Sequence, residues 1–260
     1  MANDLSVQPN ATLGLTAGAA DDSLGIDRAF VMSMARVPLI AIVWTALAVA
    51  AYAAWNALQP AEPTMPNLGS IIVLCCGMVL AAVIDGWAFK VPNWLTLSLV
   101  MSGWYLGILH DCGVVADGGG GGLGSALLGT ALGFALLFPM LFIQGMGQGD
   151  VKMQMGFGSW CGAFFGINAG STVILWGFLI GAIIGGIFGL VIMGLRRQFY
   201  KNGENFRAIL VDLQTLVTDG PSTAAARANS RRASWVRLPY GVPLCIGFLG
   251  YLWYDLFLKG

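Results

Sequence analysis

The chain has 260 residues, of which 57% are hydrophobic and only 10% are charged, whereas soluble domains usually carry about a quarter charged residues. This composition excludes an ordinary soluble domain and favours a membrane protein. The formal net charge is zero, so nothing indicates nucleic-acid binding. The five cysteines include no C-x-x-C pair, which argues against a zinc site or a disulfide framework.

In chain order, residues 1–36 are polar and predict a disordered tail without a cleaved signal peptide. Apolar stretches of the length that crosses a bilayer as a helix follow. They cover residues 37–58, 70–89, 94–110, 122–143, 153–169, 171–195 and 239–258. The prediction is an all-α, polytopic membrane protein with about seven transmembrane helices, in which 37–69 is an N-terminal helix with its external loop and 70–258 is the main membrane domain.

The basic residues predict the orientation in the bilayer. Eight of the 13 Lys and Arg residues lie in the loop 196–237, and basic residues of short loops are retained on the cytoplasmic side. We therefore expect this loop and the amino terminus to be cytoplasmic and the carboxyl terminus to be outside. Lys259, at the extreme end, is the one exception.

Glycines recur at four-residue spacing in two of the apolar stretches. Small residues at this spacing form a smooth stripe on which another helix can approach closely within lipid. The two stripes are Gly158, Gly162 and Gly166, and Gly177, Gly181, Gly185 and Gly189. We interpret both as packing surfaces.

Two acidic residues, Asp85 and Asp150, each lie at one end of an apolar stretch. A carboxylate at membrane depth is costly unless it is paired, protonated or hydrated, so it indicates a functional site. The orientation derived from the basic loop places both at the cytoplasmic boundary, where they can meet.

Two neighbouring carboxyl groups cannot both ionise easily, so one keeps a proton while the other takes one from water. This arrangement hydrolyses a peptide with no metal or cofactor. Gly147 and Gly149 allow the backbone before Asp150 to turn tightly, and Pro92 ends any helical extension after Asp85.

Three motifs resemble one family. Residues 85 and 90–96 are similar to its pattern of an aspartate, a basic residue and I-P-N-x-L-T. Residues 147–152 resemble its G-x-G-D-V-K motif, and residues 237–243 resemble its R-x-P-Y-G-x-P element. Together they resemble the type IV prepilin peptidases, which are GxGD aspartyl proteases of peptidase family A24, across residues 70–258.

The resemblance implies a six-helix core and a catalytic pair formed by Asp85 and Asp150. The residues expected to shape the site or contact the substrate are Lys90, Pro92, Asn93, Gly147, Gly149, Lys152, Pro239, Tyr240 and Gly241. For three of them two roles stay open. Lys90 and Lys152 either orient the substrate or only mark the cytoplasmic face of the membrane. Tyr240 either donates a hydrogen bond near the site or is an aromatic residue at the membrane–water interface.

The most similar subgroup is the small TadV or CpaA type, which serves Flp or Tad-like pili. The implied partners are the bilayer of a prokaryotic inner membrane and a prepilin or pseudopilin with a basic leader and an apolar helix. Cleavage is expected after a glycine at the cytoplasmic boundary. The paired C-x-x-C domain of larger members is missing, so methyl transfer is not expected, and no oligomeric state is predicted.

Two alternatives remain. The first is another GxGD protease, such as a preflagellin peptidase or a presenilin-like enzyme, although Ile84 stands where the presenilin-like branch has a tyrosine. The second is a membrane transporter or a non-enzymatic subunit of a pilus assembly machine. It predicts acidic residues deep inside the spans rather than at their ends.

Overall fold

The computed structural model describes most of the apolar segments of the chain. It describes residues 28–58, 67–88, 91–115, 121–142, 147–195 and 240–258, together with short pieces between 210 and 223. Residues 1–27 of the predicted tail 1–36 and most of the basic loop 196–237 lie outside the described residues, whereas residues 28–36 are helical.

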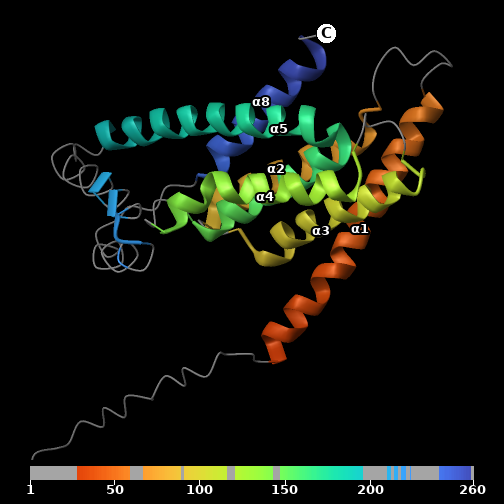
Figure 1. The fold of residues 1–260 in the computed structure, drawn as a ribbon, viewed down its shortest axis with the longest axis horizontal. Coiled ribbons are helices and arrows are strands. Elements are labelled where there is room, and N and C mark those ends of the chain that lie inside the picture. Colours follow the sequence, from red (N-terminus) through yellow and green to blue (C-terminus); the bar gives the residue numbers. More distant parts are fainter. Residues whose placement is uncertain are drawn as a thin grey trace, which may run out of the picture.

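Every regular element in the described ranges is a helix, which confirms the all-α prediction (Figure 1). The helices are α1 (Arg28–Leu58), α2 (Gly69–Ala88), α3 (Asn93–Asp111), α4 (Leu123–Phe142), α5 (Gln148–Leu195) and α8 (Gly241–Phe257). Four of them, α1, α2, α4 and α5, are long and apolar enough to cross a membrane, and α8 is a shorter apolar helix.

The predicted count of seven spans is not confirmed, because in the described ranges α3 is not among the helices that qualify as spans and α8 is shorter. The fifth and sixth predicted stretches correspond to the two parts of α5. A break interrupts α5 at Gly166, whose φ of 71° and ψ of 174° are not helical. Glycine adopts such positive φ values without the clash that a side chain would cause. Gly166 is therefore a turning point and not part of a packing stripe.

Helix α1 begins at Arg28, before the apolar stretch 37–58 that indicated it. In Figure 1 its N-terminal part projects beyond the other helices. At its other end, α1 is fastened to the start of α2. The side chain of Asn67 donates hydrogen bonds to the carbonyl oxygen of Tyr52 (3.0 Å) and to Oδ1 of Asn56 (2.8 Å), and Ser70 donates one to the carbonyl oxygen of Ala48 (3.1 Å).

The rest of the bundle packs through glycines. A Cβ added to Gly158 would overlap the carbonyl oxygen of Gly129, so α5 and α4 touch backbone to backbone before the break. After the break, Gly177 and Gly181 lie against Phe248 and Leu244 of α8. These contacts confirm the packing interpretation for Gly158, Gly177 and Gly181, and they show that α5 packs against both α4 and α8.

Large apolar side chains cover the outside of the bundle. Leu39, Val83 and Ile183, on three different helices, are each more than 60% exposed. An apolar outer surface of this extent is what a lipid-facing bundle presents, and it fits the membrane assignment.

The close contact between α4 and α5 can be tested with two glycine-to-alanine variants. Gly158→Ala should lower the free energy of unfolding by about 1–3 kcal/mol, because the added methyl group overlaps the backbone of α4. The same change at Gly186, where nothing lies within 4 Å of an added Cβ, should raise it by about 0.5–1 kcal/mol through better helix propensity. Denaturant titration in detergent micelles measures both. Equal effects would show that the two helices do not touch at Gly158.

Candidate active site

Asp85 lies near the end of α2 and is only 6% exposed. Its Oδ2 accepts a hydrogen bond of 2.9 Å from the backbone N–H of Gly241. The donor is the first residue of α8, 156 positions further along the chain. This bond therefore joins the end of one helix to the beginning of another.

Asp150 lies in the first turn of α5 and is 5% exposed. Its Oδ2 accepts a hydrogen bond of 3.1 Å from the backbone N–H of Gly147. The N-terminus of a helix carries unpaired N–H groups and a partial positive charge, which favour a carboxylate there. The carboxyl group of Asp150 is thus bound to the backbone of the turn 147–150.

The structure brings the two carboxyl groups into one site. They lie close enough for the charge of Asp85 to act on Asp150, and both are buried. The charge of Asp150 also acts on the phenol of Tyr240, which directly precedes α8. The site is therefore formed where the end of α2, the start of α5 and the start of α8 converge.

The segment before α3 forms one wall of the same region. Lys152 donates a hydrogen bond of 2.8 Å to Oδ1 of Asn93, and a Cβ added to Gly149 would lie 3.3 Å from Cβ of Val91. Pro92 caps α3 in an extended conformation with φ −71° and ψ 144°. These contacts set residues 91–93 against the first turn of α5.

Gly241 is the residue that permits the tightest contact in the site. A Cβ at this position would lie 2.7 Å from Oδ2 of Asp85, closer than real Cβ atoms come to other atoms. The absence of a side chain lets the N–H of Gly241 reach the carboxyl group. Of the other residues named from the sequence, Lys90 and Pro239 lie outside the described residues.

Within the described ranges, no group of three or more His, Cys, Asp or Glu side chains could hold a metal ion. Among the described residues, this site offers a substrate two carboxyls and a phenol, with the amine of Lys152 beside them.

Gln154 is a polar residue near the site that sequence reasoning missed. It follows Asp150 by one helical turn, is fully buried, and neither polar atom of its side chain has a hydrogen-bond partner among the described residues. Side chains of a helix lean toward its N-terminus, so this amide extends toward the turn that carries Asp150. A side-chain amide near the start of an apolar stretch was the signal that could have found it.

Comparison with known proteins adds one match. A family profile described as the type IV leader peptidase family matches residues 72–193. Residues 72–193, a little under half of the chain, are therefore similar to the type IV leader peptidase family. No curated protein and no solved structure matches the chain.

This match confirms the resemblance and points to a leader peptidase of the aspartic type. Asp85, Asp150 and the glycines before Asp150 all fall inside the matched segment. Tyr240 and Gly241 fall beyond it, yet they complete the site in space. The TadV or CpaA subgroup stays a prediction.

Because Gly241 has no side chain, its N–H group can reach Asp85, and we expect peptidase activity to require glycine at this position. Gly241→Ala should lower the cleavage rate by about 100-fold, because displacement of a reacting group by about 1 Å has that effect. Gly250→Ala is the matched control in the same helix, where nothing lies within 4 Å of an added Cβ, and it should keep the wild-type rate. Cleavage of a precursor by purified protein measures both variants. An active Gly241→Ala enzyme would contradict this role for Gly241.

Proposed function

We propose that the protein is a membrane aspartyl endopeptidase that removes the basic leader from type IV, Flp or Tad-like, prepilins or pseudopilins. The observation that carries this proposal is the meeting of two buried carboxyl groups, from α2 and α5, each held by one backbone N–H. Carboxyl groups buried in a membrane bundle are costly, so they indicate a functional site.

The chemistry follows from the sharing of one proton between the two groups. The ionised carboxylate accepts a proton from a water molecule as that water attacks the scissile carbonyl carbon. The protonated carboxyl donates its hydrogen bond to the carbonyl oxygen, where negative charge develops. When the C–N bond breaks, a proton passes to the leaving amine and the pair returns to its starting state.

The basic loop 196–237 supports a site at the cytoplasmic face. It connects α5 to α8, and α8 begins at the aspartate site. Because basic residues are retained on the cytoplasmic side, the end of the bundle that carries this loop would face the cytoplasm. The basic leader of the substrate would lie on the same side. The multi-pass fold and the family fit an inner-membrane enzyme of this kind.

A transporter or a non-enzymatic assembly subunit fits the site less well. Such proteins use acidic groups in the middle of a span to move ions or to couple subunits. Asp85 and Asp150 instead lie at helix ends, beside backbone N–H groups that hold them in place. This placement favours chemistry on a peptide that reaches the membrane boundary.

Co-expression with a precursor that has a basic leader, a glycine and an apolar helix tests the proposal. Asp85→Asn and Asp150→Asn should each abolish processing, because an amide neither accepts the proton of water nor donates one to the leaving amine. Asp219→Asn is the control, because Asp219 is an exposed residue of the 196–237 loop. It should process normally.

Immunoblotting gives the ratio of mature to precursor protein, and mass spectrometry should show an unmethylated new amino terminus. Protein levels of all variants must match. Processing that persists in either aspartate variant would remove that residue from the catalytic pair, and processing by no version of the chain would reject the proposed function.

A further inference from the structure

Gln154 is a buried amide to which the packing of the helices gives no partner. It is 0% exposed, and neither Nε2 nor Oε1 has a hydrogen-bond partner among the described residues. Its neighbours on both sides, Met153 and Met155, are unbranched apolar residues of similar length. A third methionine would avoid the free energy that an unpaired buried amide costs. An exception of this kind in a packed interior indicates a role in the chemistry or a partner that is bound only in some states.

The spacing along α5 directs this amide to Asp150. The two residues are four positions apart, so they lie on one face of the helix with about 5–6 Å between their Cβ atoms. Because helical side chains lean toward the N-terminus, the longer side chain of Gln154 extends back over the turn that holds Asp150. Oδ2 of Asp150 accepts a hydrogen bond from Gly147, and a carboxyl group has room for further bonds. The amide can therefore reach a carboxyl group that is not saturated.

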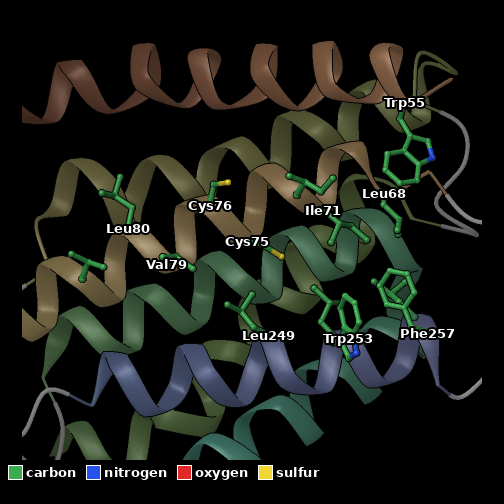
Figure 2. Close-up of a pocket in the computed structure, with 14 residues that line it drawn as sticks. Trp55, Leu68, Ile71, Cys75, Cys76, Val79, Leu80, Leu249, Trp253 and Phe257 are labelled. Atoms are coloured by element: carbon green, nitrogen blue, oxygen red, sulfur yellow. The ribbon is translucent and has the colours of Figure 1, made fainter. Parts of the chain in front are cut away.

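The helices around this turn offer the amide little else. The backbone of α4 covers it, since a Cβ added to Gly133 would lie 2.6 Å from the carbonyl oxygen of Gln154. Thr130 of α4 already donates to a carbonyl oxygen of its own helix (2.8 Å) and accepts from an indole N–H (3.0 Å). The groove between α2 and α8 is lined by no acidic, basic or amide side chain (Figure 2). Among the described side chains, Asp150 is thus the partner that the spacing favours.

An amide suits the changes that Asp150 undergoes during peptide hydrolysis. A carboxyl group that takes part in proton transfer is ionised in one step and protonated in another. The NH2 group of a glutamine donates to the ionised form, and its C=O group accepts from the protonated form. Gln154 can therefore hold Asp150 in both states. Asp85 has no such neighbour, because the residues three or four positions away from it within α2 are all alanines, namely Ala81, Ala82 and Ala88.

We propose that Gln154 is a positioning residue for Asp150, an inference that rests on the proposed function. Its amide binds the carboxyl group and keeps it directed at Asp85 and at the attacking water while the proton moves. Loss of the amide leaves both carboxyl groups in place but lets the side chain of Asp150 turn away from the productive geometry, to which reaction rates are sensitive.

Thermal unfolding in detergent micelles tests the contact without any substrate. Gln154→Met keeps the size of the side chain and removes its hydrogen bonds, so it should lower the Tm of the otherwise wild-type chain by about 2–4 °C. In the Asp150→Ala background the amide has no partner, and the same change should raise the Tm instead. A shift of the same sign in both backgrounds would overturn the contact.

Ser159→Ala is the matched control, because Ser159 is equally buried on α5 and its hydroxyl donates to the carbonyl oxygen of Gly156 (2.9 Å). It should shift the Tm by the same amount in both backgrounds. The rival partner for the amide is the carbonyl oxygen of Ala135 in α4, which lacks its helical donor because Pro139 has no N–H group. With Ala135 as the partner, Gln154→Met would also give equal shifts.

Cleavage kinetics test the positioning role itself, with rates referred to the folded fraction of each variant. Gln154→Met should lower kcat by about tenfold, the effect of losing one hydrogen bond to a charged group, while KM stays near the wild-type value because the amide is buried. Gln154→Asn, whose amide is one methylene too short to reach Asp150, should behave in the same way, and Ser159→Ala should keep both constants. If the wild type cleaves a precursor and Gln154→Met keeps its kcat, the role of Gln154 is wrong and the peptidase function stands. If the wild type cleaves no precursor, both proposals are wrong.

Discussion

The burial of two carboxyl groups at one end of an apolar bundle is the constraint on which the rest of the structure depends. Neither group can remain there without polar partners, and lipid offers none. The partners are backbone N–H groups at helix ends, one from Gly241 and one from Gly147. Helix α8 must therefore begin against the end of α2, and α5 must begin beside both.

Glycines make this convergence possible at two scales. Across the bundle, Gly129 and Gly158 let α4 and α5 touch through their backbones, so that the first turn of α5 is held firmly. Within the site, the bare Cα of Gly241 brings an N–H group to Asp85.

The sequence predicted the helical class, the approximate positions of the spans and the two aspartates, because apolar length and rare intramembrane charge are local signals. It predicted two helical stretches in the region of α5 but did not place the break at Gly166, since a glycine in a packing stripe and one with positive φ look alike. It also missed Gln154 and the link from Asn67 to α1. Their environments depend on neighbours that are distant in the chain, and no local pattern reports those contacts.

The most direct measurement is the proximity of positions 85 and 150. A chain in which the five native cysteines are replaced would carry Asp85→Cys and Asp150→Cys, with a protease site introduced between α3 and α4. After treatment with a short bifunctional thiol reagent and cleavage at that site, the two fragments should stay joined, whereas either single-cysteine chain should separate. Fragments that separate in the double-cysteine chain would contradict a shared site and, with it, a carboxyl pair that activates water.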